Sequence, residues 1–313
     1  MNKWFLRENA RRFFRINMPM RVFVTPSSPI EDLEIYATGI DYFPPIINKL
    51  IEEQIADTCY WSNKIQEQKE LFDPLFEEIL EAINFLNKGS IQISRGLSPK
   101  NDPSFWLLMN EKLRGFSHLK RLEQDAPKTY SYFKEIEEKY LFYLDSFFKS
   151  VKNSSAEEFS ANLNIPLGFK VDETIAKLTN QKFKNIPLIQ SLISVISLMN
   201  TCLNAYKQMN DDNAIRKRPS SWPLMNTNIS ASGIALMFAK RFKQREKVDV
   251  FLYFIENKKI IKFDGTVVNL QSIDSENKER VAINFDFPDG SSQDFLMHKI
   301  QEYELILCED LTF

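Results

Sequence analysis

The chain is poor in histidine, cysteine and glycine: its 313 residues include two histidines, three cysteines and eight glycines. The two histidines, His118 and His298, do not have the HExxH spacing of a zinc site. Neither the GxSxG motif of hydrolases nor a phosphate-loop glycine pattern occurs in the sequence. We therefore expect structural roles for both histidines, no metal site, no cofactor and no enzymatic activity.

The cysteines argue against a disulfide framework. Cys59, Cys202 and Cys308 lie too far apart for a CxxC pair, and their number is odd. The first residues, "MNKWFLRENARR", lack the apolar segment of a signal peptide. Both observations predict a protein of the cytoplasm.

An excess of either charge is also missing. Forty basic residues stand against forty-two acidic ones, which gives a net charge of −2. Such a chain has no general attraction for DNA, RNA or an anionic membrane, so any bound anion must be held locally. The longest apolar run, residues 187–206, is interrupted by polar residues and falls short of the roughly 20 apolar residues of a membrane span. We expect no such span.

Hydrophobic residues make up 43% of the chain, enough for one large core or two smaller ones. Their spacing changes twice along the sequence. Apolar residues first alternate with other residues from Ile16 to Val24, which predicts a half-buried strand. Pro19 within this stretch indicates an edge or a bulge.

A helical spacing follows from residue 29 to about residue 212. Ser28, Pro29 and Glu31 have the pattern of a helix start with a capping box. Pro74 and Pro103 predict further helix starts, and Gly89 predicts a helix end. The helices expected from the pattern span residues 44–72, 74–87, 103–124, 127–152, 155–163 and 186–210.

The last of these helices carries a heptad seam. Its members follow at spacings of four and three: Leu188, Leu192, Val195, Met199, Cys202 and Tyr206. Two interpretations remain open. The seam is either the core of the helical segment or the surface through which a homo-oligomer assembles as a multi-helix coiled coil.

After residue 213 the spacing of two returns in residues 234–238, 248–254 and 281–287. Residues 258–270 add a strand, with Asp264-Gly265 as a signal for a turn or bulge. Strands without helices between them favour an antiparallel barrel or sandwich. Ser292 is placed to cap a final helix that covers the sheet. The class is therefore α+β, with domains at 1–28 plus 213–313 and, inserted between them, an all-α domain at 29–212.

Two short motifs suit a guanine nucleotide. Residues 11–15, "RRFFR", supply Arg11, Arg12 and Arg15, whose planar guanidinium groups match phosphate oxygens and the O6/N7 edge of guanine. Residues 228–233, "NISASG", supply the other three side chains: Asn228, Ser230 and Gly233. Asparagine both donates and accepts, serine can bond a phosphate, and glycine permits a turn that a Cβ would block.

These motifs resemble the two-part signature of the PilZ domain, a β-barrel receptor for the bacterial second messenger cyclic di-GMP. That signature is RxxxR on an N-terminal arm and [D/N]xSxxG on a later strand and turn, and both parts are complete here. The resemblance covers residues 10–25 and about 216–313. The long helical insertion is similar to that of the atypical, tetrameric PilZ type. Ala282 departs from the family, which often has glycine there.

The resemblance implies an antiparallel PilZ-like barrel with a C-terminal helix and a role for each motif residue. Arg11 and Arg15 would grip the phosphates and contact the guanines, assisted by Arg12. Asn228 would contact a guanine, Ser230 a phosphate, and Gly233 would shape the turn.

Two functions follow from this resemblance. The chain is either a cyclic di-GMP receptor that transmits binding to its helical domain and acts on a downstream protein, or a PilZ-like assembly or adaptor protein that does not bind nucleotide.

Overall fold

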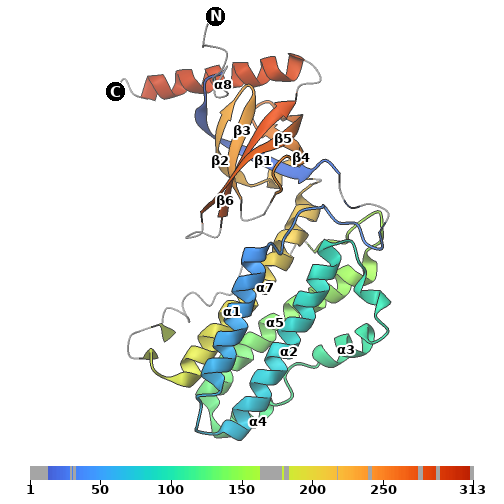
Figure 1. Ribbon diagram of the computed structural model, residues 1–313, viewed down its shortest axis with the longest axis vertical. Coiled ribbons are helices and arrows are strands. Elements are labelled where there is room, and N and C mark those ends of the chain that lie inside the picture. Colours follow the sequence, from blue (N-terminus) through green and yellow to red (C-terminus); the bar gives the residue numbers. More distant parts are fainter. Residues whose placement is uncertain are drawn as a thin grey trace, which may run out of the picture. The chain divides into compact units, whose positions relative to one another are not determined.

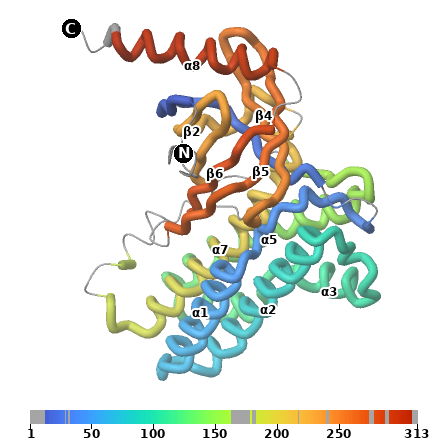
Figure 2. Tube along the Cα trace, turned by 45° about the horizontal axis from the view of Figure 1, so that its top comes forward, coloured from blue at the N-terminus to red at the C-terminus, as the bar shows by residue number. Residues whose placement is uncertain are grey.

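The computed structural model describes residues 13–28, 30, 33–162, 178–179, 183–216, 218–238, 242–273, 278–286 and 290–310. The chain divides into two compact units (Figures 1 and 2). The barrel unit comprises Met1–Pro29, Gly39–Asp41 and Ile215–Phe313. The helical unit comprises Ile30–Thr38 and Tyr42–Ala214.

The barrel unit contains a closed antiparallel barrel with the strand order β1-β2-β3-β6-β5-β4. Its strands are β1 (Ile16–Pro26), β2 (Leu224–Ser230), β3 (Gly233–Phe238), β4 (Lys247–Phe254), β5 (Lys259–Ile273) and β6 (Lys278–Asp286). Buried residues that pair across neighbouring strands form a ring inside it: Ile16, Ile229, Ile234, Ile283 and Val267. The predicted α+β class is confirmed, and the sheet is a barrel rather than a sandwich.

Strand β1 changes partner along its length. Residues 16–21 pair with β2, and residues 21–26 pair with β4. Pro19 therefore lies where β1 is paired on one side only, as expected of a residue without a backbone N–H. The alternation of buried and exposed residues ends at Val22, because Phe23 also stacks on the buried Trp222, with ring centroids 5.8 Å apart.

Two local predictions in the barrel unit are wrong. Asp264-Gly265 does not form a turn, since β5 continues through both residues. The register shift lies three residues later, between Val267 and Asn269. The final helix, α8 (Gly290–Asp310), begins before Ser292, so this serine lies in the first turn instead of capping it.

Helix α8 lies across the barrel (Figure 1) and contacts β1. Leu296 and Ile300, in its first half, are buried. Leu305, Ile306 and Leu307, in its second half, are exposed. The helix therefore covers the barrel mainly through its first three turns.

The helical unit is built from α1 (Pro45–Ser62), α2 (Lys69–Ser94), α3 (Phe105–Lys112), α4 (Leu119–Asp125), α5 (Pro127–Asn153) and α7 (Pro187–Ile215), which ends where the chain enters the barrel unit. One-turn helices lie at Pro99–Asn101 and, in the barrel unit, at Pro219–Ser221.

The predicted breaks at Pro74 and Gly89 are wrong, because α2 runs through both residues. The break lies instead between Ser62 and Lys69, and its last residue, Gln68, has a left-handed φ of 54°. Gly89 is buried, and a Cβ there would lie 2.5 Å from Cζ of Phe147 on α5. The glycine therefore permits close packing of two helices and does not end one.

Three further helix predictions need correction. The segment 103–124 is two helices, separated at Gly115 with a φ of 81°. Residues 155–162 are not helical, and residue 163 lies outside the described residues. Ser28 starts no helix: Ile30 forms an isolated β-bridge with Ala37, and the described residues up to 44 contain no helical turn, while Pro29 and Glu31 lie outside them.

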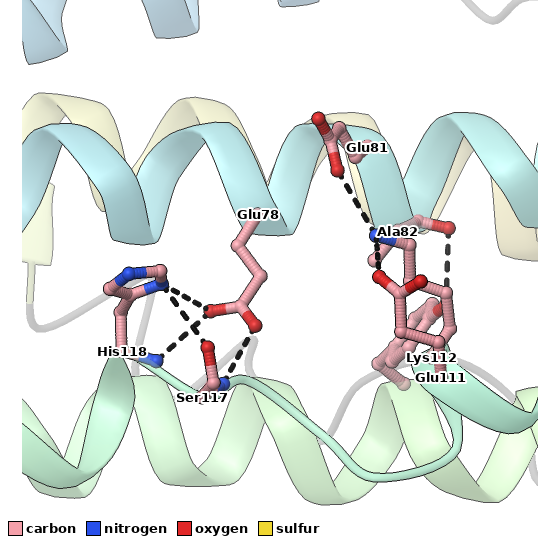
Figure 3. A network of polar contacts seen from close by, with 8 residues as sticks. Glu78, Glu81, Ala82, Glu111, Lys112, Ser117 and His118 are labelled. Carbon is pink, nitrogen blue, oxygen red and sulfur yellow. Dashed lines mark hydrogen bonds and ion pairs between the residues drawn. The ribbon is translucent and has the colours of Figure 1, made fainter. Parts of the chain in front are cut away.

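A carboxylate fastens the start of α4 to α2 (Figure 3). Glu78 accepts hydrogen bonds from the backbone N–H groups of Ser117 (2.7 Å) and His118 (3.1 Å). Its carboxylate also lies 3.1 Å from Nδ1 of His118. These contacts satisfy backbone donors at a helix start that has no cap from its own side chains.

The heptad seam belongs to the core of a single chain. Leu192, Val195, Met199, Cys202 and Tyr206 are all buried, and Leu188 is half-buried. The Tyr206 ring contacts those of Phe147 and Tyr143 on α5 at 5.6 and 6.5 Å. Burial within one chain favours the first of the two interpretations, the core of the helical segment, and a role of these residues in oligomerisation stays a prediction.

Among the described helices, α7 is long and apolar enough to cross a membrane, with a mean hydropathy of 1.4 over 18 residues. Half of that window is buried in the protein. A core helix has the same length and composition, and α7 packs on α5 through the contact of Tyr206 with Phe147.

Candidate functional site

The pairing of β1 with β2 brings the two motifs together. Ile16 pairs with Ile229 and Asn17 with Asn228, so the end of the arginine arm lies beside the start of "NISASG". Nη1 of Arg15 donates to the main-chain oxygen of Asn228 at 3.3 Å and to its Oδ1 at 3.4 Å. Two motif residues separated by 213 positions are thus in direct contact.

A residue that the sequence did not single out completes this contact. Nδ2 of Asn228 donates to Oδ1 of Asn17 at 2.9 Å. Asn17 is an exposed residue of β1, and in the sequence it is only one of the polar residues that alternate with apolar ones. Its partner becomes apparent only with the β1–β2 register. The three side chains Asn17, Asn228 and Arg15 form what we call the amide chain.

Ser230 is the last residue of β2, next to the tight connection to β3. It is buried, and its hydroxyl lies 3.3 Å from both the carbonyl of Gly233 and the hydroxyl of Ser232. Its Oγ also accepts a bond of 3.4 Å from the N–H of Ser232. The hydroxyl is therefore engaged with the turn formed by Ala231 and Ser232.

Gly233 is required for a different reason from the predicted one. It is the first residue of β3 and is absent from the described glycines with positive φ, so it does not form the turn itself. A Cβ at this position would lie 2.4 Å from the carbonyl oxygen of Ile283 on β6. The glycine allows the backbones of β3 and β6 to approach closely.

The surroundings of the motifs come from three further elements. Gln293 of α8 donates through Nε2 to the carbonyl of Ala231 at 3.2 Å, which ties the helix to the turn. Asn228 pairs with Ala235 of β3, and Ala235 pairs with Ala282 of β6, so small side chains continue the outward row that begins at Asn17.

Arg11 and Arg12 lie outside the described residues. A hollow of about 170 Å³ lies further along β1 and is lined by residues of β1, β4 and α8, among them Met18, Arg21 and Lys299. None of the four predicted nucleotide-binding residues that the structure describes, Arg15, Asn228, Ser230 and Gly233, lines it.

Both histidines lie beside carboxylates, and Cys202 lies in the core. His118 pairs with Glu78, and His298 pairs with Glu302 at 3.1 Å. Burial raises the pKa of the Cys202 thiol to about 12, which keeps it protonated. Within the part of the chain that the structure describes, no three His, Cys, Asp or Glu residues are grouped to hold a metal ion.

Comparisons with known proteins give one weak likeness. No protein-family model matches the chain, and no curated protein matches it. A solved structure, that of the Bacillus subtilis inhibitor of motility MotI/DgrA, matches with 20% identity and a TM-score of 0.24. The match covers 27% of this chain and 42% of that one, less than half the length of either.

Proposed function

We propose that this chain is a cyclic di-GMP receptor that binds the dinucleotide between the arginine arm and the β2–β3 turn. The observation that carries the proposal is the contact of Arg15 with Asn228, since it joins the last residue of one motif to the first residue of the other. The site binds its ligand and does not cleave it.

The chemistry of these groups fits a ligand with two guanines and two phosphates. A guanidinium presents a planar fork of N–H donors, which matches two phosphate oxygens or the O6 and N7 acceptors of guanine. Arg11 and Arg12 precede Arg15 in the sequence and would add two more such groups. Because the chain has a net charge of only −2, this local cluster supplies the attraction for the anion.

Calorimetric titration with cyclic di-GMP at low salt tests this proposal. We expect heat of binding from the natural chain and an affinity about 10- to 100-fold lower for Arg15→Ala, since a hydrogen bond to a charged group contributes about 1.5–3 kcal/mol. Arg121→Ala is the matched control, because Arg121 is an exposed arginine of the helical unit.

The absence of heat with the natural chain at saturating ligand would refute the receptor and favour the alternative, a PilZ-like assembly or adaptor protein. If Arg15→Ala binds cyclic di-GMP with the natural affinity, the assigned site is wrong, but the chain is still a receptor.

Contacts within the barrel unit also connect this site to Ile215, where the chain enters that unit. Trp222 lies two residues before β2 and is buried, and its Nε1 donates to the carbonyl of Ile215 at 2.9 Å. Ile215 is the last residue of α7. Arg21 of β1 holds the main-chain oxygen of Trp222 at 2.5 Å. We propose that a ligand that clamps β1 to β2 is sensed at the end of α7 through Trp222.

A further inference from the structure

We propose that the hollow beside β1 is a docking site for the first residues of the chain itself, and that it holds the side chain of Trp4. We call residues 1–12 the N-terminal segment. The inference goes beyond the proposed function, because it concerns a different surface of the barrel unit and needs no nucleotide.

The hollow lies where β1 changes its partner strand. Residues 16–21 of β1 pair with β2 and residues 21–26 pair with β4, so the β4 side of residues 16–20 has no partner among the described strands. Residues 253–257 and the second half of α8 form the other walls. Pro19 lacks an N–H group, and a proline at a strand edge discourages pairing with a further strand. An occupant of the hollow therefore makes side-chain contacts and does not extend the sheet.

Three large apolar side chains line the hollow and are nevertheless exposed. Leu224 at the start of β2 is 63% exposed, Ile255 after β4 is 55% exposed, and Ile306 of α8 is 52% exposed. Single exposed apolar residues are common on protein surfaces. Three of them around one hollow, contributed by three parts of the barrel unit, mark a surface that binds an apolar group.

The charged groups of the lining do not change this chemistry. Nζ of Lys299 donates to Oε2 of Glu302 at 2.6 Å, and Nη1 of Arg21 donates to the main-chain oxygen of Trp222. Glu256, the remaining charged residue of the lining, lies in the exposed turn after β4. The occupant of the hollow is therefore an apolar side chain and not an ion.

The size of the hollow, about 170 Å³, suits one aromatic side chain. An apolar protein cavity of about 150 Å³ binds benzene. The N-terminal segment lies outside the described residues, and its sequence contains one apolar run, Trp4-Phe5-Leu6. The indole of Trp4 matches the hollow, and Phe5 and Leu6 supply apolar groups for its exposed rim.

The N-terminal segment can reach the hollow because it is attached to the strand that lines it. Trp4 precedes Phe13 by nine residues, which span up to about 30 Å when extended. Pro19, in the wall of the hollow, follows Phe13 by six residues, or at most about 20 Å. A short tether also gives an effective concentration in the millimolar range. This favours the chain's own segment over a free partner of similar composition.

Fluorine NMR of protein labelled with 5-fluorotryptophan tests the docking of Trp4 without any ligand. The chain has four tryptophans, and the signal that is missing in Trp4→Phe belongs to Trp4. In the natural chain we expect this signal to lie away from the position of the free amino acid. It should move to that position in Ile306→Asp, because a carboxylate in the wall makes burial of an apolar ring unfavourable.

Leu305→Asp is the matched control. Leu305 is the preceding residue of α8, is 66% exposed and does not line the hollow, so the same substitution there should leave the Trp4 signal unchanged. A Trp4 signal at the free position in the natural chain overturns the inference. So does a Trp4 signal that is the same in Ile306→Asp as in the natural chain.

A second measurement observes the hollow itself. The ring current of a docked Trp4 should shift the methyl signals of Ile255 and Ile306. These signals should therefore move in Trp4→Ser and stay in place in Asn9→Ser, which changes a polar residue of the same segment. Methyl signals that do not move in Trp4→Ser overturn the inference, even if Ile306→Asp disturbs the fold of α8.

Dilution distinguishes the chain's own segment from that of a second copy. An intramolecular contact does not depend on protein concentration, so the Trp4 signal should stay in place on dilution. A signal that moves to the free position on dilution assigns the hollow to a second copy and overturns the inference. None of these measurements includes a nucleotide, so a failed titration with cyclic di-GMP would overturn the proposed function alone.

Discussion

At Gly233 a single methyl group would meet the backbone of the neighbouring strand. Its Cβ would lie 2.4 Å from the carbonyl oxygen of Ile283, and a backbone atom of a closed barrel has little freedom to move away. We expect Gly233→Ala to lower the free energy of unfolding by about 1–3 kcal/mol through overpacking. Urea unfolding measures this.

Gly290→Ala is the matched control, since nothing lies within 4 Å of a Cβ placed there. Its effect should stay within about 0.5 kcal/mol. Equal effects of the two substitutions would contradict the steric role of Gly233.

Glu78 makes the stability of the helical unit depend on pH in the acid range. Burial raises the pKa of its carboxyl, but the hydrogen bonds from Ser117 and His118 outweigh burial and bring it below the usual 4.5. Such a group stabilises the folded state above its unfolded pKa and loses this contribution as pH falls through the folded value. We expect the difference in unfolding free energy between the natural chain and Glu78→Gln to shrink as pH is lowered from about 5.5 to about 3, when it is followed by circular dichroism.

Glu81→Gln, one turn further along α2, serves as the comparison. Glu81 is mostly exposed and pairs with Lys112, so this substitution should change stability little at any pH. A difference for Glu78→Gln that stays constant with pH would exclude the proposed linkage.

At this scale the sequence predicts residue identity better than residue role. Arg15 and Asn228 could be found because each belongs to a short motif, and the structure brings them into contact. Asn17 could not, because its importance depends on a strand register formed across more than two hundred residues. For the same reason the need for glycine at position 233 could be predicted from its motif, whereas the close approach of β6 that causes it could not.

The heptad seam of α7 is buried inside a single chain, and a substitution there tests its role in the core. Val195 is completely buried, so Val195→Glu would place a carboxylate without a partner in an apolar core, at a cost of several kcal/mol. We expect loss of helical content and of thermal stability. Asn204→Glu, on the exposed side of the same helix, should leave both unchanged.

Light scattering and circular dichroism together test this prediction. If Val195→Glu keeps its helical content but has a smaller molar mass than the natural protein, the seam is an interface between copies and not the core of one chain.

Helix existence was easier to predict than helix boundaries. The long α5 was predicted to within a residue at each end because its apolar period and Pro127 agree. In α2 the local signals of Pro74 and Gly89 were overridden by tertiary packing, since Phe72, Leu75 and Phe76 are buried around the proline and Phe147 fills the space over the glycine. The true break depends on a left-handed Gln68, for which the sequence carries no strong signal.

At the scale of the whole molecule, two changes of hydrophobic period were enough to predict an antiparallel barrel or sandwich interrupted by helices, because a period of two and a period near 3.6 require different elements. Transmission between the barrel and the helices is a separate matter. The transmission proposed above rests on single contacts within the barrel unit, such as that of Trp222 with Ile215, which no pattern in the sequence indicates.

Hydrogen exchange with and without cyclic di-GMP tests this transmission. In the natural chain we expect ligand to slow exchange in β1, in β2 and in the residues around Ile215. Trp222→Phe keeps an aromatic ring against Phe23 but removes the N–H donor, so protection near Ile215 should fall while β1 and β2 stay protected. Protection near Ile215 that survives in this variant would exclude Trp222 as the connection.

The buried hydrogen bond between Tyr42 and Asp212 has a consequence for the order of folding. The Tyr42 hydroxyl donates to Oδ2 of Asp212 at 2.7 Å, so residues near the beginning and the end of the helical unit lie side by side. Before it forms, closing β1 onto β2 requires a loop of about two hundred residues to find its ends, and loop-closure entropy rises with length. Afterwards only residues 27–41 and 213–223 separate the strands from this bond. We therefore expect the folded helices to lower the entropic cost of closing the barrel, and barrel closure to be slower when the helices have not yet formed.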